Sequence, residues 1–346
     1  MNNHRLPAEW EPQDAILLAW PHKSTAWQNQ LDDIVQLYEA LVSVICDYAD
    51  VVIAIPEAII PDVRERLSAM DIPLEYVYFY PVEFNDTWVR DFGPITVQTD
   101  QSMKLLNFEF NGWGKKYAFD LDNQMSTKMQ ALYAFPAAKF ESIDFVLEGG
   151  SIETDGQGTL LTTASCLLNK NRNPHLSQPQ IEQHLKDTLG AQKINWLHSG
   201  YLAGDDTDGH IDVLARICPN NTLIYTACDD EADEHYLALK EMEQELMNMT
   251  NADGQAYRLL PLPWPGAKYD DNDHRLPATY ANFLVVNEAV LVPIYDSLSD
   301  EDALDVVSQA FPGYEIFGIP CLRLIERGGS LHCITMQLPE GVLLQA

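Results

Sequence analysis

Hydrophobic positions recur along this chain with helical spacing in some segments and as short continuous runs in others. The clearest helical segment precedes an apolar run from Val51 to Ile55. Its apolar residues follow the i, i+3, i+4 spacing that places side chains on one helix face: Ile34, Leu37, Tyr38, Leu41, Val42 and Ile45. The run from Val51 to Ile55 is typical of a buried strand.

The same alternation continues to the end of the chain. Further helices are predicted near 57–69, 121–134, 179–189, 230–249 and 299–310. Strand-like stretches lie at 74–80, 103–110, 143–165, 193–198, 210–217, 222–227, 257–262, 282–294 and 315–337. Turn signals divide some of these stretches, as at Asp155-Gly156-Gln157-Gly158 and Asn287-Glu288. The pattern predicts an α/β protein in which a helix and a few strands recur about five times.

No Pro/Gly/Ser-rich linker or low-complexity tract interrupts this series. The length of 346 residues permits two domains or one large one. We therefore expect a single domain over residues 1–346. Periodicity alone leaves open whether the repeated units form an open sheet or close around an axis.

The balance of acidic and basic residues limits the classes of molecule that the protein is expected to bind. The chain carries 52 acidic and 21 basic residues, a formal net charge of −31. This charge argues against binding nucleic acid or an anionic membrane, both of which require basic surface. An acidic field can also concentrate a cationic substrate, although solubility or adaptation to salt or cold accounts for most of the charge.

The sequence predicts neither a membrane-spanning segment nor an export signal. No apolar run reaches the roughly 18–20 residues of a membrane-spanning helix, and the N-terminus lacks a signal-peptide core. We expect a cytoplasmic location, and a homo-oligomer is compatible with the sequence.

Six scattered cysteines form no C-x-x-C pair, so most are expected to be buried thiols. Cys333 differs because it follows Gly328 and Gly329, whose backbone can approach a ligand closely. His332 is adjacent, but neighbouring side chains of a strand point to opposite faces. His332 is therefore expected to be structural, and a base for Cys333 must come from elsewhere.

The segment 204–214 can supply that base. With strand periodicity, Asp208, His210 and Asp212 share one face. A calcium loop is excluded because Ile211 stands where glycine is needed and no Glu occupies the last ligand position. A zinc or iron site lacks an HExxH motif or cysteine cluster to complete it. The remaining interpretation makes His210 a proton shuttle and Asp212 an anchor for a cation.

Two further segments carry charge. In the segment 85–94, Trp88 stands beside Arg90 and Asp91, and an aromatic face next to a carboxylate suits a guanidinium group. The alternative is a surface loop that ends in a Gly-Pro turn. Glu148 precedes Gly149-Gly150, a pattern that by itself indicates a turn.

Taken together, these segments resemble the agmatine deiminase and bacterial-type peptidyl-arginine deiminase family, within the guanidine-modifying superfamily. The resemblance covers nearly the whole chain. Its motifs, in family order, are PAEWEP from Pro7, AWP from Ala19, NDTWVRDFGP from Asn85, NGWG from Asn111, LEGGSIETDGQGTLLTT from Leu147, CLLNKNRNP from Cys166, TDGHID from Thr207, LPATYANF from Leu276 and GGSLHCIT from Gly328.

The resemblance implies a five-bladed α/β propeller (pentein) with pseudo-fivefold ββαβ-type repeats around a central active site. It also implies the site residues, position by position. They are Cys333 as nucleophile, His210 as general acid/base, Asp91 and Asp212 as guanidinium-binding carboxylates, Glu148 as a further acid, and Trp88, Trp113 and Asn282 as substrate contacts.

The implied reaction is hydrolysis of a small cationic guanidinium substrate. Cys333 attacks as a thiolate, His210 protonates the departing ammonia, and water then cleaves an S-alkylthiouronium intermediate. For agmatine the products are N-carbamoylputrescine and ammonia. The resemblance implies no metal ion and no organic cofactor.

Some positions depart from the agmatine-specific pattern of the family. This chain reads Arg327-Gly328-Gly329-Ser330 instead of Gly-Gly-Gly-Asn, and Met336-Gln337 instead of Gln-Gln. The continuation Val213-Leu214-Ala215-Arg216 resembles a less characterised bacterial branch. These departures concern the pocket for the far end of the substrate and leave the chemical core intact.

Agmatine is favoured because nothing resembles a separate peptide-binding domain, and free or C-terminal peptidyl arginine is the alternative. A papain-like or caspase-like hydrolase lacks its local signature around the cysteine. A nitrilase-type amidohydrolase needs a lysine that is missing near Cys333. A non-catalytic polyamine- or arginine-binding protein would use Asp91 and Asp212 but would not need Cys333 with His210.

Overall fold

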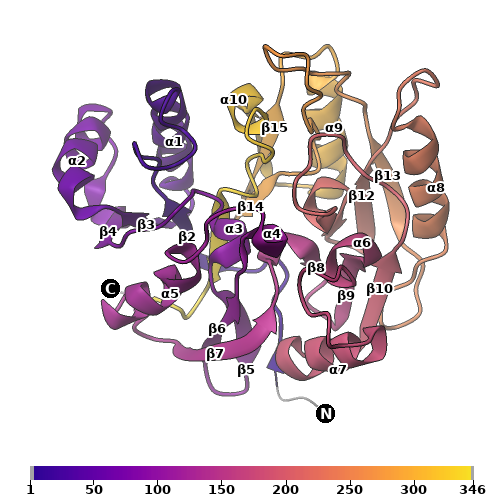
Figure 1. The fold of residues 1–346 in the computed structure, drawn as a ribbon, viewed down its shortest axis with the longest axis horizontal. Coiled ribbons are helices and arrows are strands. Elements are labelled where there is room, and N and C mark those ends of the chain that lie inside the picture. The colour runs from indigo at the N-terminus through magenta and orange to yellow at the C-terminus, as the bar shows by residue number, and fades with distance from the viewer. Residues whose placement is uncertain (1–3, 344–346) are drawn as a thin grey trace. The chain divides into compact units, whose positions relative to one another are not determined.

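The computed structural model describes residues 4–343 (Figure 1). These residues divide into two compact units. Within the described residues, unit 1 comprises 4–10 and 150–332, and unit 2 comprises 11–149 and 333–343. The chain passes between the units at Trp10–Glu11, Gly149–Gly150 and His332–Cys333. None of these boundaries carries a linker composition, which is why the sequence suggested none.

Within unit 1, three sheets share one topology. Each has an antiparallel strand pair followed by a helix and a third strand that pairs parallel to the second. The elements, in chain order, are β8 (Ile152–Thr154), β9 (Thr159–Thr163), α7 (Gln178–Leu189), β10 (Lys193–Leu197); β11 (Ala215–Cys218), β12 (Thr222–Thr226), α8 (Tyr236–Met247), β13 (Arg258–Leu262); β14 (Leu284–Val286), β15 (Ala289–Ile294), α9 (Asp300–Ala310) and β16 (Glu315–Pro320).

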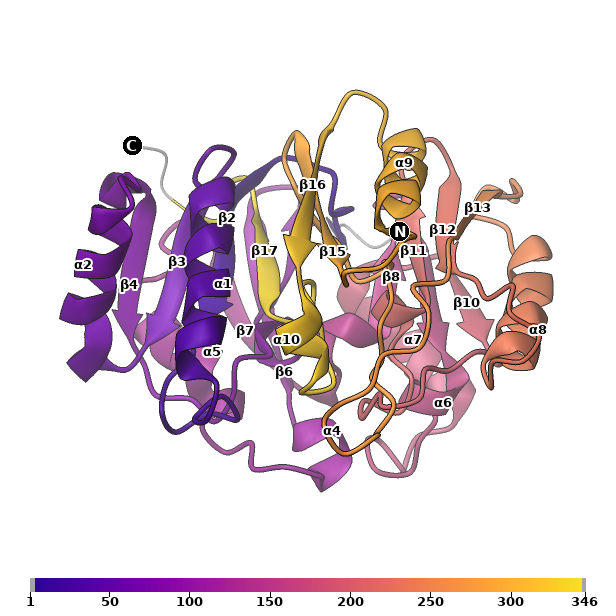
Figure 2. The same ribbon diagram turned by 90° about the horizontal axis from the view of Figure 1, so that it is seen from above.

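Unit 2 repeats the topology twice more among its described residues. One repeat is β5 (Ile95–Thr99), β6 (Met103–Glu109), α5 (Asp122–Ala131) and β7 (Lys139–Val146). The other is β17 (Thr335–Pro339), β2 (Gln13–Ala19), α1 (Leu31–Ile45) and β3 (Asp50–Ile55), extended by α2 (Ile60–Ala69) and β4 (Val77–Pro81). Here the strand after Cys333 pairs antiparallel with a strand near the N-terminus, and Figure 2 shows α1 beside these strands.

Short elements connect the repeats. They are β1 (His4–Arg5), the helices α3 (Val89–Phe92), α4 (Gly112–Lys115), α6 (Ala164–Leu167) and α10 (Leu322–Ile325), and the 3₁₀ turns η1 (Glu57–Ile59), η2 (Leu74–Tyr76), η3 (Gly149–Ser151) and η4 (Ile211–Val213). Most of the candidate site residues lie on or next to these short connections rather than in the sheets.

The longer helices form where the sequence pattern predicted them. The face of α1 that carries Ile34, Tyr38 and Leu41 is fully buried. Helix α7 begins with a capping box between Ser177 and Gln180 and ends at Gly190, whose φ is +74°. Such caps satisfy the backbone groups that a helix end leaves without intrahelical partners.

The repeats bury apolar side chains between each helix and its sheet. In unit 1, α8 contributes Leu239, Met242 and Leu246 to a cluster that includes Leu223 and Tyr225 of β12. Among residues 4–343, no helix is both long and apolar enough to cross a bilayer.

Two strand predictions are wrong. The expected strand 210–217 begins only at Ala215, because residues 211–213 form η4. The expected strand 315–337 is interrupted by α10 and by the turn 331–334, so His332 and Cys333 lie on a turn. Three strands, β1, β2 and β5, were not predicted.

Candidate active site

In unit 2, Cys333 lies against the short helix α3. The Arg90 backbone N–H donates to the Cys333 carbonyl oxygen at 3.1 Å, and the cysteine is 5% exposed. The Arg90 guanidinium donates to Gln337 Oε1 at 2.5 Å and also approaches the Met336 sulfur. Met336, which departs from the family pattern, and Gln337, which matches it, therefore both link α3 to β17.

Glu148 joins the same neighbourhood through its glycine neighbour. A Cβ on Gly149 would lie 2.3 Å from the Arg90 carbonyl oxygen, so only glycine permits this approach. Glu148 is fully buried. The Glu-Gly-Gly motif thus packs a carboxylate-bearing segment onto the backbone of α3.

Asp91 of α3 is held by Trp113. The indole Nε1–H donates to Asp91 Oδ2 at 2.8 Å, and both side chains are buried. Trp113 lies on a left-handed turn in which residues 112–115 all have positive φ. Because a left-handed conformation is unfavourable for a residue with a Cβ, this turn is a strained feature at a candidate site.

Trp88, at the start of α3, is largely buried. Its ring centroid lies 5.8 Å from that of Trp27, and Trp27 Nε1 donates to Thr87 Oγ1 at 2.8 Å. The segment leading into α3 is also fixed, because Asp122 Oδ1 accepts from the backbone N–H groups of Asn85 and Asp86. The NDTWVRDFGP motif is therefore an anchored segment, and the alternative of a surface loop is wrong.

In unit 1, His210 is fully buried and precedes η4. Its backbone N–H donates to Thr207 Oγ1 at 3.0 Å, and the two carboxylate oxygens of Asp205 accept from the backbone of Thr207 and Gly209. Gly209, with φ of +90°, completes this tight loop. Side-chain-to-backbone bonds of this kind favour turns over strands, which explains why strand periodicity failed here.

Arg172 clamps the same loop from the CLLNKNRNP motif. Its guanidinium donates to Asp208 Oδ2 at 2.5 Å and to the Thr207 carbonyl at 2.7 Å. Asp208 has φ of +70°. The side chain of Asp208 therefore pairs with Arg172, and the expectation that Asp208, His210 and Asp212 share one strand face is wrong.

Asp212 is a fully buried carboxylate with donors on one oxygen. Asp212 Oδ2 lies 2.8 Å from His332 Nδ1 and accepts from Asn282 Nδ2 at 3.1 Å. Burial alone would raise the pKa of Asp212, but the hydrogen bond from His332 and the charges of His332, His210 and Arg216 outweigh it. The pKa of Asp212 consequently lies below its usual value.

Asn282 uses both its amide nitrogen and its amide oxygen to hold Asp212 and His332 together. Besides its bond to Asp212, its Oδ1 accepts from the His332 backbone N–H at 3.0 Å. Asn282 is fully buried and is bonded to both Asp212 and His332.

Further charged side chains contact His332 at its other ring nitrogen. His332 Nε2 is 2.7 Å from Glu9 Oε1, and Glu9 Oε2 accepts from Arg216 at 2.6 Å. Arg216 also pairs with Glu153 and donates to the carbonyl oxygens of Ala281 and Phe283. Sequence reasoning missed this cluster, although Glu9 and Arg216 both stand in segments that it had singled out.

This cluster offers donors that a metal ion could use. Ligand atoms of Glu9, Glu153 and His332 lie within 4.8 Å of one another. The Arg216 guanidinium already bonds both carboxylates and lies 3.1 Å from His332 Nε2. Because this cation takes the place a metal would need, the residues do not fit a metal site.

Several other cysteines are poor nucleophiles. Burial raises the pKa of the Cys46 thiol to about 12, and burial also raises the pKa of Cys218, Cys228 and Cys321. A thiol with a raised pKa carries little thiolate at neutral pH. The prediction that most cysteines are buried thiols is confirmed for Cys166, Cys218, Cys228 and Cys321, while Cys46 is only partly buried.

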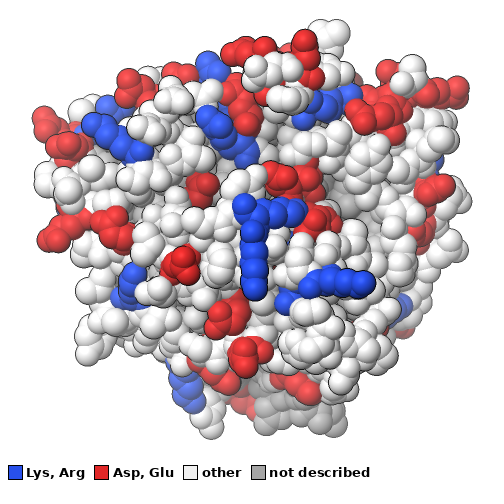
Figure 3. Space-filling model, viewed as in Figure 1, with Lys and Arg blue, Asp and Glu red and all other residues white. Residues whose placement is uncertain are grey.

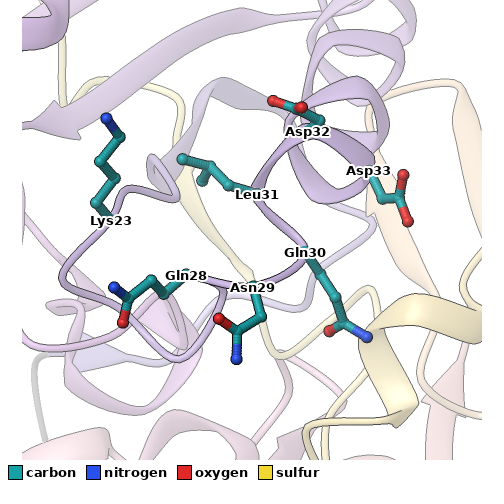
Figure 4. A pocket seen from close by; sticks show the side chains of 7 residues that line it. All are labelled: Lys23, Gln28, Asn29, Gln30, Leu31, Asp32 and Asp33. Atoms are coloured by element: carbon teal, nitrogen blue, oxygen red, sulfur yellow. The ribbon is translucent and has the colours of Figure 1, made fainter.

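A surface hollow of about 500 Å³ lies beside the start of α1 in unit 2 (Figure 4). Its lining is formed by Lys23 and residues 28–33. None of the predicted site residues is among them. Asp32 and Asp33 lie in the first turn of α1, where acidic side chains interact favourably with the helix dipole, so these two carboxylates are explained by the helix itself.

The structure thus assembles two sets of predicted residues. Asp91, Trp113, Glu148 and Cys333 gather around Arg90 in unit 2. His210, Asp212 and Asn282 gather in unit 1. Both sets place buried carboxylates next to aromatic or imidazole groups, which is the chemistry that an organic cation requires.

A family model described as Porphyromonas-type peptidyl-arginine deiminase matches residues 5–339. An agmatine deiminase of Pseudomonas syringae pv. tomato is 34% identical, over 96% of this chain and 95% of the relative.

Two solved structures extend the similarity to the fold. One, described provisionally as a peptidyl-arginine deiminase, is 43% identical with a TM-score of 0.93, over 99% of this chain and 100% of that one. The other is a Cys→Ser variant of C. jejuni agmatine deiminase with substrate bound, 37% identical with a TM-score of 0.90, over 98% and 97% of the two chains. These matches confirm the predicted fold class, an α/β propeller of five ββαβ-type repeats.

Proposed function

This chain belongs to the Porphyromonas-type peptidyl-arginine deiminase family, and on that premise we propose that it hydrolyses agmatine to N-carbamoylputrescine and ammonia. Relatives that cover almost the whole chain are agmatine deiminases. One of them holds its substrate in a variant in which a cysteine is replaced by serine. A trapped substrate is the expected result when the replaced thiol is the attacking group.

The observation that carries the proposal is a pair of buried carboxylates, each fixed by N–H donors. Asp91 accepts from Trp113, and Asp212 accepts from Asn282 and contacts His332. A buried ionised carboxylate is costly unless a cation or several donors compensate it. A guanidinium group, always charged and rich in N–H donors, is the ligand that such carboxylates suit.

In the proposed reaction, Asp91 and Asp212 orient the guanidinium and keep it protonated, hence electrophilic. The Cys333 thiolate forms a C–S bond to the central carbon. The C–N bond to one NH₂ group then breaks, and His210 supplies the proton with which ammonia leaves. The intermediate is an S-alkylthiouronium on Cys333.

Water completes the reaction. His210, now neutral, accepts a proton from water as its oxygen bonds to the central carbon, and the C–S bond breaks to restore the thiolate. The proton that remains on the new oxygen is released to solvent, which leaves a neutral ureido group as the product. We assign Glu148 to proton handling on the substrate nitrogens, and Trp88 and Trp113 to packing against the substrate. The proposal that both sets of residues act on one guanidinium, as one catalytic domain, rests on the family match and on this chemistry.

Agmatine is favoured over arginine by the state of the buried arginines. Arg90 bonds Gln337, Arg172 pairs with Asp208, and Arg216 pairs with Glu9 and Glu153. An arginine substrate would bring a carboxylate that needs a cation of its own. Because these three cations are already engaged with protein acceptors, the decarboxylated substrate fits better.

The surrounding charge agrees with a cationic substrate. The face drawn in Figure 3 displays more acidic than basic side chains, in line with the net charge of −31. Such a field speeds the encounter with a cation. A cytoplasmic location, a homo-oligomeric state and the lack of nucleic-acid or membrane partners stay predictions.

The test is a side-by-side assay of ureido product and ammonia with agmatine, free arginine and a peptide ending in arginine. We expect turnover of agmatine, at least tenfold weaker turnover of the other two, and no loss of activity after treatment with a chelator. Preference for arginine or the peptide would reject the assigned substrate. Binding of agmatine without any turnover would instead identify a non-catalytic polyamine-binding protein.

A further inference from the structure

His332 lies between two carboxylates inside unit 1. Its Nδ1 is 2.8 Å from Asp212 Oδ2, and its Nε2 is 2.7 Å from Glu9 Oε1. Histidine and both carboxylates are largely or fully buried, with side-chain exposures of 1% for His332, 0% for Asp212 and 12% for Glu9. Each ring nitrogen therefore has its own acceptor at hydrogen-bond distance.

The acceptors determine the protonation state of the ring. An ionised carboxylate can only accept a hydrogen bond, so a nitrogen at this distance must carry a hydrogen. Glu9 is kept ionised by Arg216, which donates to its other oxygen at 2.6 Å. Asp212 is kept ionised by the donors and positive charges around it. Arg216 Nη2 also lies 3.1 Å from Nε2, but the Glu9 oxygen is closer at 2.7 Å and lies in the acceptor role, so we infer that both ring nitrogens carry a hydrogen and that His332 is an imidazolium.

We propose that His332 is a permanently protonated positioning residue, held by Glu9 and Arg216, that fixes the Asp212 carboxylate for the guanidinium of the substrate. The proposal rests on the proposed function in one respect, the assignment of Asp212 as a guanidinium ligand. It gives a role to Glu9 of the PAEWEP motif and to Arg216, neither of which the reaction itself uses.

Arg216 has enough fixed contacts to hold Glu9 in place and, through Glu9, to hold His332. It pairs with Glu153 and donates to two backbone carbonyl oxygens, and its guanidinium carbon lies 4.5 Å from the centroid of the Phe283 ring. Glu153 also accepts from the Ile217 backbone N–H at 3.2 Å. A guanidinium group that is already held by this many partners loses little further conformational freedom when it also bonds Glu9.

The charges of the cluster explain how it favours a cation. When all three carboxylates are ionised, Glu9, Glu153 and Asp212 outweigh Arg216 and protonated His332 by one negative charge. Burial raises the pKa of Glu153 to about 7, so this charge is complete only above that pH. A bound guanidinium would neutralise it. Coulomb interactions are strong where water is excluded, so a neutral ligand would leave the residual charge uncompensated.

The first test reads the protonation of His332 directly and needs no turnover. In protein labelled with ¹⁵N-histidine, the His332 signal is identified by its loss in His332→Gln. We expect both ring nitrogens to remain protonated from about pH 6 to 9, whereas an ordinary histidine titrates near 6.5. A neutral ring at pH 7 would overturn the proposal. This outcome is independent of whether agmatine is the substrate.

The second test uses Glu9→Gln, which keeps an acceptor for Nε2–H but removes the negative charge that holds the second proton. We expect kcat/KM to fall about 10–100-fold, as is typical when a partner that orients a site ligand is lost. The fall should come mainly from KM and grow as pH rises, because His332 then loses its proton and no longer donates to Asp212.

The matched control is Glu231→Gln, an equal charge change at an exposed position of unit 1. It should leave kcat/KM and its pH profile unchanged. A defect in Glu9→Gln that is constant across pH would indicate a merely structural role and overturn the proposal. Wild-type protein that turns over no guanidinium at all would reject the proposed function, while the ¹⁵N spectrum would still decide the state of His332.

Discussion

The Trp113 indole N–H donates to Asp91 Oδ2 at 2.8 Å, with both residues buried in unit 2. A tryptophan proposed as a packing surface for substrate is thus also a hydrogen-bond donor to a proposed substrate ligand. A carboxylate restrained in this way is oriented before substrate arrives, which lowers the entropic cost of binding.

Trp113→Phe removes this hydrogen bond and keeps an aromatic ring. A hydrogen bond to a charged group contributes about 1.5–3 kcal/mol, so kcat/KM for agmatine should fall about tenfold or more. The measurement is steady-state release of ammonia. The control is Trp196→Phe, which loses the indole bond to Glu182 at 2.9 Å and should not alter kinetics. Equal effects of the two substitutions would refute a specific role for Trp113.

Gly112→Ala tests the left-handed turn that presents Trp113. Gly112 has φ of +67°, and a Cβ there would lie 2.6 Å from the Tyr117 carbonyl oxygen. Gly254→Ala is the control, because its φ of +80° is similar but no atom lies within 4 Å of the added Cβ. The control should lose about 1–2 kcal/mol of unfolding free energy, and Gly112→Ala should lose more in urea titration. A smaller loss for Gly112→Ala would contradict the steric account.

Arg172→Lys tests the clamp on the loop before His210. Lysine retains the charge but cannot bond Asp208 and the Thr207 carbonyl in the fork geometry of arginine. We expect about a tenfold fall in kcat/KM because His210 is less well positioned. Arg323→Lys, at a half-exposed pair with Glu326, should be silent. Wild-type kinetics in Arg172→Lys would show that the clamp is unimportant for catalysis.

We expect the buried carboxyl group of Asp122 to make the unfolding free energy of the protein depend on pH. Burial, opposed by the backbone N–H groups of Asn85 and Asp86 and reinforced by the charge of Asp86, raises the pKa of Asp122 to about 8. Between the ordinary value of 3.8 and about 8, the folded state binds more protons than the unfolded state. Its contribution to stability is therefore complete at low pH and is lost as pH rises through about 8.

Asp122→Asn keeps the acceptor for Asn85 and Asp86 but cannot ionise. Relative to wild type, its unfolding free energy should increase with pH between about pH 5 and 9, by up to a few kcal/mol at about 1.4 kcal/mol per unit of pKa shift. Urea titrations at several pH values measure this difference. The exposed Asp120→Asn should show no such trend, and a flat difference for Asp122→Asn would contradict the raised pKa.

Sequence predicted the repeated elements well because they depend on local periodicity. The buried face of α1, for example, follows from the spacing of its apolar residues in the sequence. The connections were harder to predict. At Thr207 and Gly209, the Asp205 side chain bonds the backbone and produces a turn where alternation suggested a strand.

The site itself was predicted through resemblance, while its supports were not. Nothing in the spacing of Glu9, Arg216 and His332, each more than 100 residues from the next, indicates that they touch. His332 was set aside because a strand would turn it away from Cys333. Since residues 331–334 form a turn, that argument does not apply, and the role of His332 comes from its contacts with Asp212 and Glu9.

The central claim is that Cys333 attacks the guanidinium carbon of agmatine. The most direct measurement is mass spectrometry of protein quenched in acid during turnover, followed by peptide mapping. We predict an adduct with the mass of agmatine less ammonia on the peptide that contains Cys333, present in Cys46→Ala and absent, together with all turnover, in Cys333→Ala. Undiminished turnover in Cys333→Ala, or an adduct on a different cysteine, would contradict the account.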